Sequence, residues 1–163
     1  MTNPMSTNTI THVTNTVTLV DVRGPRFAAW ITTAVLVITL LVAGFSPPAA
    51  ATILSLQAAT FAIGAVRGPR QHPYGLVFSR VVAPRIGPVA EREPVPPLKF
   101  AQLVGLIFTV AGVIGFTTGV AFLGVAATAL ALAAAFLNAA FGICLGCQLY
   151  PLAARLRRAP TPA

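Results

Sequence analysis

Apolar residues fall into four long runs along this chain, at residues 27–45, 49–66, 100–116 and 120–150. None of the runs contains Asp, Glu, Lys or Arg. Each is close to or longer than the ~20 residues that a helix needs to cross a hydrocarbon core of about 30 Å. A charged side chain at the centre of such a helix would cost roughly 2.5–3.5 kcal/mol on insertion scales. The pattern therefore predicts four membrane-spanning helices.

The segments between the runs differ sharply in length. Residues 46–48 and 117–119 form short uncharged links, whereas residues 67–99 form a long connection rich in proline. Short links favour antiparallel neighbours, so we expect two helical hairpins. The predicted fold class is an all-α integral membrane protein with a long loop between its second and third helices. Within that loop, residues 74–82 are consistent with either a short helix at the lipid interface or an irregular loop packed on the bundle.

Composition and charge support the membrane assignment and orient the helices. Apolar residues make up 56% of the chain and charged residues only 9%, against about 25% in soluble domains. All eleven Lys and Arg side chains precede the first run, separate the second from the third, or follow the fourth. By the positive-inside rule both termini and the long loop are expected in the cytoplasm of a bacterial inner membrane. A net charge of +8 thus points to lipid, and not to nucleic acid.

We expect one membrane domain at residues 23–157 between two tails. Residues 1–22, rich in Thr and Asn, read as a disordered cytoplasmic tail, and residues 158–163 as a short C-terminal tail. The arginines that border the apolar runs are predicted to anchor the helices at lipid headgroups. These are Arg23, Arg26, Arg67, Arg70, Arg155, Arg157 and Arg158.

Small residues recur at helical spacing in the third and fourth runs. They are Gly105, Gly112, Gly115 and Gly119, followed by Ala127, Ala131, Ala135 and Ala139. Lipid gives apolar helices no hydrophobic reason to associate, so close contact through small faces has to do so. We expect these faces to pack the third helix on the fourth, with homodimerisation through them as the alternative. The amides of Gln57 and Asn138 are expected to bond across to other helices or to line a substrate path.

The only two cysteines, Cys144 and Cys147, stand three residues apart near the end of the fourth run. A helix from residue 120 would bring them to the cytoplasmic interface. Three interpretations stay open: small apolar packing residues, a metal site that would need His72 and a second copy of the chain, or a redox and sulfur-carrying pair. Nearby arginines favour a thiolate and a helix C-terminus opposes it.

Several short motifs together resemble a known family. They are Phe27-Ala28-Ala29, Gly68-Pro69-Arg70, Pro73-Tyr74-Gly75, Pro84-Arg85, Lys99-Phe100-Ala101-Gln102 and, most specifically, residues 137–147 with Tyr150. Over residues 21–157 the chain is similar to the bacterial membrane family called domain of unknown function four-three-nine-five. That resemblance implies a small four-helix protein, frequent in actinobacteria, whose gene often lies beside thioredoxin-like and rhodanese-type proteins.

Taken together, the pair and the resemblance favour a thiol–disulfide or sulfane-sulfur exchange component. Cys144 and Cys147 would carry the exchange with a thioredoxin-like or rhodanese-type partner. We expect no cofactor and no metal, and a component that works with a partner rather than an autonomous enzyme. The alternatives are a transporter, or transporter subunit, for a small sulfur compound, and an accessory subunit without chemistry of its own.

Overall fold

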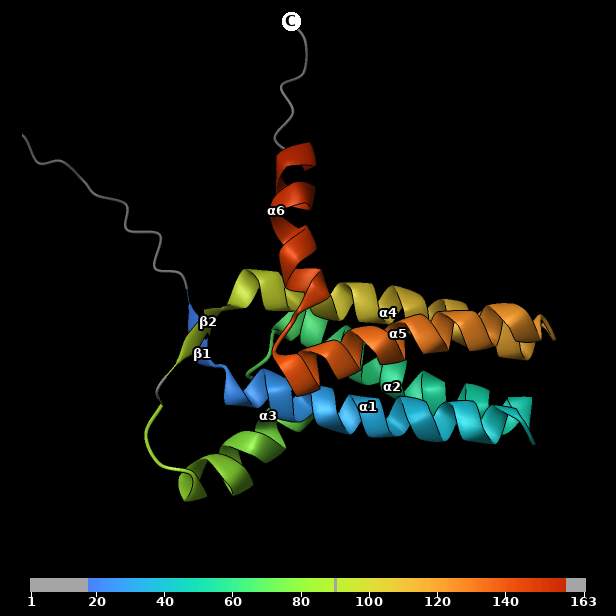
Figure 1. The fold of residues 1–163 in the computed structure, drawn as a ribbon, viewed down its shortest axis with the longest axis horizontal. Helices are drawn as coiled ribbons and strands as arrows, with labels where there is room; N and C mark the ends of the chain where they lie inside the picture. The colour runs from blue at the N-terminus through green and yellow to red at the C-terminus, as the bar shows by residue number, and fades with distance from the viewer. Residues whose placement is uncertain (1–17, 90, 158–163) are drawn as a thin grey trace, which may run out of the picture.

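The computed structural model describes residues 18–89 and 91–157 of this chain. Four long helices lie side by side (Figure 1), namely α1 (Arg23–Ala43), α2 (Pro47–Arg67), α4 (Val95–Thr117) and α5 (Ala121–Phe141). Each has the length and hydropathy to cross a membrane. The prediction of an all-α membrane protein with four spanning helices is therefore confirmed.

Shorter elements gather at one end of these helices. Between α2 and α4 the chain forms α3 (Pro73–Val77), a π-helical turn η1 (Phe78–Val82) and a 3₁₀ turn η2 (Ala83–Arg85). Two short strands, β1 (Leu19–Asp21) and β2 (Arg92–Pro94), pair antiparallel, with Val20 opposite Glu93. Residues 74–82 are thus helical, although Phe78 is buried and packs against Phe27 of α1, and their place at the lipid interface stays a prediction. A further helix, α6 (Leu145–Arg157), follows α5.

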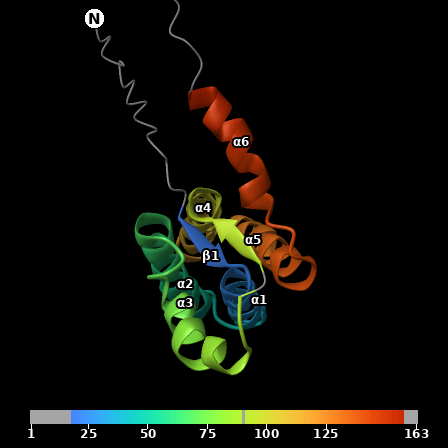
Figure 2. The same ribbon diagram turned by 90° about the vertical axis from the view of Figure 1, so that its left-hand side faces the viewer.

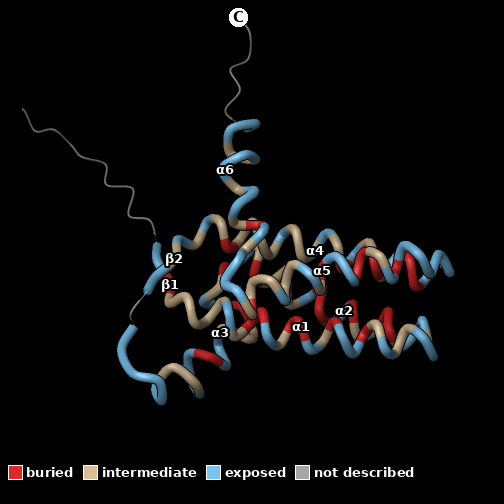
Figure 3. The backbone as a smooth tube through the Cα atoms, viewed as in Figure 1, coloured by how far each residue is buried: buried red, intermediate tan, exposed pale blue. Residues whose placement is uncertain are grey.

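The four long helices form a ring in the order α1, α2, α4, α5, with α5 returning to α1. Figure 2 shows the ring from the end that carries the strands, with β1 lying across it. The core of the ring lies along the inner faces of the helices (Figure 3), where Leu36, Ala50, Leu54, Phe116 and Ala131 are buried together. The short links expected at residues 46–48 and 117–119 both lie at the far end (Figure 1).

Glycines of α4 let the helices approach closely, as the sequence predicts, but they face α2 as well as α5. A Cβ at Gly115 would clash with the backbone nitrogen of Gly124 on α5. Gly105 instead faces the ring of Phe61 on α2, at 2.8 Å from a built Cβ. Gly119 packs against nothing within 4 Å and has a φ of +79°. It is therefore a turn residue, and its expected packing role is wrong.

Three helices begin earlier than the apolar pattern suggests, the first and the third by four and five residues. The first starts at Arg23, where the Asp21 carboxylate accepts a hydrogen bond of 3.0 Å from the Arg23 backbone N–H. The third starts at Val95, before Pro96 and Pro97. Proline is tolerated in the first turn of a helix because the N–H groups there have no intrahelical acceptor. The prolines that suggested a loop up to residue 99 therefore open a helix.

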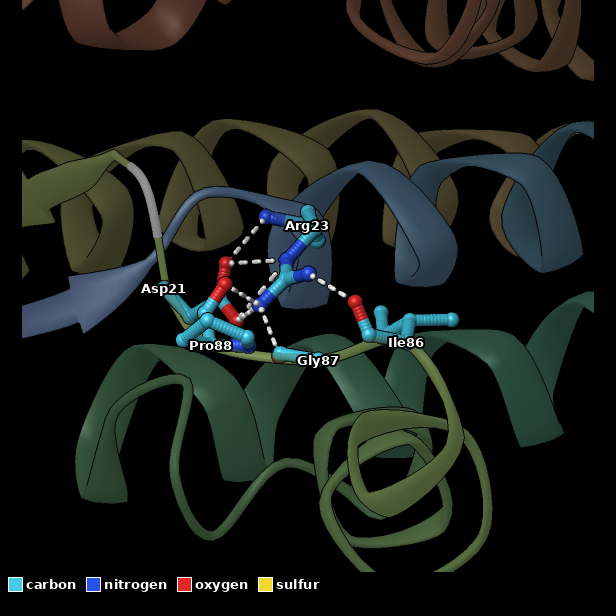
Figure 4. Close-up of polar contacts among 5 residues, drawn as sticks. All are labelled: Asp21, Arg23, Ile86, Gly87 and Pro88. Carbon is cyan, nitrogen blue, oxygen red and sulfur yellow. Dashed lines mark hydrogen bonds and ion pairs between the residues drawn. The ribbon is translucent and has the colours of Figure 1, made fainter.

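The long connection between α2 and α4 is held to the start of α1 by Arg23. Its guanidinium pairs with Asp21 at 2.8 Å and donates to the carbonyl oxygens of Ile86, Gly87 and Pro88 (Figure 4). The Arg23 side chain also lowers the pKa of Asp21 by hydrogen bonding to its carboxylate. A residue expected to anchor the helix to lipid thus also organises the protein's own loop. Of the predicted tail at residues 1–22, residues 1–17 lie outside the described part and residues 19–21 form β1.

The contact between Gly115 and Gly124 gives a first prediction. Gly115→Ala should lower the free energy of unfolding by about 1–3 kcal/mol, the usual cost of overpacking, because the new methyl group meets backbone that cannot move alone. Unfolding of the purified protein in detergent measures it. Gly44→Ala is the matched control, since a Cβ there makes only an ordinary contact of 3.4 Å. Equal stability of the two variants would contradict the packing described.

Candidate dithiol site

The helix that precedes the cysteines stops earlier than predicted. A single helix over residues 120–150 was expected, but α5 ends at Phe141 and α6 begins at Leu145. Gly142 has a φ of +71°, a left-handed conformation that terminates helices and that glycine adopts at little cost. The N–H groups of Gly142 and Ile143 donate to the carbonyls of Asn138 and Leu137 at 3.1 and 3.2 Å. These bonds close the end of α5.

The break places the cysteine pair at a helix N-terminus, and not at the C-terminus that the sequence suggested. Cys144 stands at the N-cap position of α6, where its sulfur accepts a hydrogen bond of 3.2 Å from the Cys147 backbone N–H. Its carbonyl accepts from the Gln148 N–H at 3.1 Å. The two sulfurs form a disulfide across a Cα–Cα distance of 5.2 Å. Both residues are half-buried.

Contacts with α4 fix the start of α6. A Cβ at Gly146 would lie 2.5 Å from the Ala101 Cα, so the two helices touch through backbone. The ring of Tyr150 meets Phe100 edge to face, with centroids 6.0 Å apart. From this contact α6 runs steeply away from the direction of the long helices (Figure 1). Its exposed leucines, Leu149, Leu152 and Leu156, recur at the spacing of one helix face.

The arginines near the pair differ from those expected. Arg155 lies on α6, about 16 Å from Cys144 along the axis at 1.5 Å per residue. The side chain of Arg157 and all of Arg158 lie outside the described residues. Arg26 of α1 comes nearer, because its guanidinium carbon lies 3.8 Å from a Cβ built on Gly142. No sequence spacing links Arg26 to residue 142, so only the fold reveals this neighbour.

The remaining expected anchors lie at the same end of the helices. Arg67 is the last residue of α2, and Arg70 donates a hydrogen bond of 3.0 Å to the Leu19 carbonyl of β1. Lys99 donates to the carbonyl of Val66 at 2.6 Å. These cationic side chains therefore connect neighbouring elements at this end of the bundle, Arg70 to β1 and Lys99 of α4 to α2. Their contact with lipid headgroups stays a prediction.

Two cavities lie at this end of the bundle and share part of their walls. One of about 310 Å³ lies between α1, α4, α5 and the start of α6, and Cys144 borders it. The other, of about 520 Å³, lies beneath β1 and α3 and is bordered by His72, Arg70, Arg92 and Asp21. Gln102 lines both cavities, as do Pro25, Ala28 and Leu98.

Two polar side chains, those of His72 and Gln102, meet at Gly64 with buried atoms that have no hydrogen-bond partner among the described residues. A Cβ built on Gly64 would lie 2.7 Å from Cδ2 of His72 and 2.9 Å from Oε1 of Gln102. Both ring nitrogens of His72 and this oxygen of Gln102 are buried and unpaired within the described residues. Burial lowers the pKa of His72 to about 4, so the imidazole is neutral at physiological pH. Gln102 lies within the third apolar run, but no sequence pattern distinguishes the burial of its Oε1 beside His72.

Gln57 makes the interhelical bonds predicted for it. Its carboxamide nitrogen donates to the Thr32 hydroxyl of α1 at 3.4 Å, and its oxygen accepts from the Tyr74 hydroxyl of α3 at 2.9 Å. Asn138 borders the smaller cavity, close to Cys144. The hydroxyls of several buried threonines donate hydrogen bonds to backbone carbonyls of the preceding helical turn, as the Thr128 hydroxyl does to the Gly124 carbonyl.

A metal site within one chain finds no support in the described residues. Among them no three His, Cys, Asp or Glu side chains lie close enough together to hold an ion. His72, the third ligand considered for the pair, borders the larger cavity, whereas Cys144 borders the smaller one. The disulfide-forming pair is therefore the feature with chemistry to explain.

The fold and the site define a four-helix membrane protein with a cysteine pair at the N-terminus of a helix that leaves the bundle. The chain belongs to the family described as Domain of unknown function (DUF4395), whose model matches residues 20–155. The resemblance noted in the sequence is thus confirmed. No curated protein and no solved structure matches the chain.

The buried histidine predicts how stability depends on pH. The pKa of His72 is about 4 in the folded protein against 6.5 unperturbed. Between pH 4 and pH 6.5 the histidine therefore binds a proton in the unfolded chain but stays neutral in the folded protein. The free energy of unfolding should therefore fall as pH drops below about 6.5, by about 1 kcal/mol per unit. His72→Gln should reduce that slope. His12, the other histidine, is present in both proteins, and equal slopes would contradict the prediction.

Proposed function

We propose that this protein exchanges electrons or sulfane sulfur between its Cys144–Cys147 pair and a soluble thioredoxin-like or rhodanese-type partner. The observation that carries the proposal is the N-cap position of Cys144, next to a cysteine with which it forms a disulfide. A helix N-terminus presents unpaired N–H groups and a positive dipole end, both of which favour a thiolate. The N-terminal thiol of the pair is therefore the attacking one.

The exchange follows a two-step course in which all atoms and electrons balance. The Cys144 thiolate attacks a disulfide of the partner, forms a mixed disulfide and displaces a partner thiolate. The Cys147 thiolate then attacks the Cys144 sulfur and releases the partner as a dithiol. With a persulfide partner, Cys144 takes up the outer sulfur as its own persulfide. Attack by Cys147 then forms the disulfide and releases hydrosulfide.

We place this chemistry at the cytoplasmic face of a bacterial inner membrane. The charge distribution supports that side, since Arg70, Arg80 and Arg85 lie on the connection between α2 and α4 while the opposite links carry no charge. The direction of α6, steep to the spanning helices (Figure 1), suits a helix that lies along the membrane surface with its leucine face in the interface. A soluble partner could then reach the pair.

Reporter fusions test this topology. A reporter active only in the cytoplasm should work when fused after Arg85 and fail when fused after Gly119. The expected result follows from the positive-inside rule, because positive charge is retained on the cytoplasmic side. A reporter active only outside the membrane should give the reverse pattern, which controls for expression. Cytoplasmic activity of the Gly119 fusion would overturn the orientation.

Partner trapping tests the exchange itself. Cys147→Ser removes the thiol that resolves the mixed disulfide and should accumulate an adduct between Cys144 and an oxidised partner. Cys144→Ser should accumulate none, although serine still caps the helix and is similar in size. Adducts are detected by non-reducing electrophoresis and mass spectrometry, with the doubly substituted protein as baseline.

The alternatives give different results in the same experiment. A packing role for the cysteines gives no adduct from either variant. A gate in a transport path alters the flux of a small sulfur compound without trapping any protein. Absence of an adduct from Cys147→Ser, with oxidised and persulfidated partners supplied, would contradict the exchange mechanism.

A further inference from the structure

The cavity beside Cys144 reaches from the pair into the bundle. Its wall on α5 runs from Leu130 to Asn138, or about 12 Å at 1.5 Å per residue. Phe61 and Phe108 border it on the other helices. Its volume of about 310 Å³ lies at the lower end of the range for small-molecule sites, which are mostly apolar with a few polar groups. Its mostly apolar lining, on helices long and apolar enough to cross a membrane, suits a molecule that is soluble in lipid.

Polar side chains on three helices border this cavity. Asn138 and Thr32 border it, and the Thr32 hydroxyl already accepts from Gln57. Gln102 also borders it, and because its Oε1 is fully buried against Gly64 and His72, the nitrogen of its carboxamide is the end that can serve the cavity. That nitrogen is a hydrogen-bond donor, and the Asn138 carboxamide offers a second donor for a carbonyl oxygen.

These features together select one chemical class of ligand. Oxidation of a dithiol releases two electrons and two protons, so its acceptor must take both. A quinone does so, carries two carbonyl oxygens on a ring, and its isoprenoid tail dissolves in lipid. Its oxygens become hydroxyl donors on reduction. The carboxamide nitrogens of Asn138 and Gln102 suit the two carbonyl oxygens of the quinone form.

We propose that a membrane quinone binds in the cavity lined by Cys144, Gln102 and Asn138 and accepts electrons from the cysteine pair. This inference rests on the proposed exchange function and names the second partner of the same site. The reduced pair loses two electrons and two protons and forms its S–S bond, while the quinone becomes a quinol. The exchange of the proposed function then runs in the reverse direction: a partner dithiol attacks the Cys144–Cys147 disulfide, reduces it and leaves as the partner disulfide. The net reaction converts partner dithiol and quinone into partner disulfide and quinol.

The experiment uses the full-length protein, reduced and freed of reductant, in lipid nanodiscs. A short-chain benzoquinone or naphthoquinone is added, quinol is followed by absorbance, and thiols are counted by alkylation and mass spectrometry. We expect one quinol for each disulfide formed. Cys144→Ser and Cys147→Ser should each abolish quinol formation, since neither protein can form the internal disulfide.

Gln102→Leu tests the cavity. Loss of one hydrogen bond of about 1.4 kcal/mol should raise the quinone concentration for half-maximal rate about tenfold. Gln148→Leu is the matched control, because Gln148 is exposed on α6 and does not border the cavity. Its half-maximal concentration should equal that of the unsubstituted protein. Both variants should retain thiol labelling of the pair, which shows that the site remains folded.

The outcomes separate this inference from the function on which it rests. Partner adducts without quinol formation would overturn the quinone site and leave the exchange function standing, with the cavity then holding a lipid chain or a transported sulfur compound. Quinol formation at equal half-maximal concentrations in Gln102→Leu and Gln148→Leu would show reaction at exposed thiols and overturn the cavity site. Neither adduct nor quinol would overturn both.

Discussion

Close approach of the helices at glycines holds the spanning helices together, because lipid surrounds apolar side chains as favourably as the bundle interior does. At Gly115 and Gly124 the two helices of the second hairpin, α4 and α5, approach so closely that no side chain fits between them. The same device recurs where Gly146 of α6 meets Ala101 of α4. Backbone contact therefore shapes the bundle and also sets the position of the cysteine pair on it.

The second determinant is the left-handed residue Gly142. If α5 continued as a regular helix, the cysteines would lie in its last turns, where unpaired carbonyls oppose a thiolate. The break turns the chain and begins a new helix at the same place. The pair then meets unpaired N–H groups, and the sulfur of Cys144 uses one of them. One glycine thus reverses the electrostatic surroundings of the pair.

The sequence predicted the four spanning helices because uncharged apolar runs of that length have few other uses in a protein. It did not predict where α5 ends, since Gly142 follows several glycines that continue helices without a break, such as Gly105 and Gly112. The cavities could not be predicted either. Gln102 and His72 are separated by 30 positions in sequence, and only the packing of α4 against α2 brings both to Gly64.

The strand pair at the bundle end has a consequence for biosynthesis. Residues 19–21 bond to residues 92–94, so the chain closes on itself just before α4 begins. Arg23 and the carbonyls it binds also precede that helix. During translation the strand pair and the Arg23 hydrogen bonds can therefore form around the first hairpin before the second hairpin has left the ribosome. The later hairpin then inserts against the first hairpin, and the cysteines, which follow α5 in the chain, reach the bundle after the strand pair has formed.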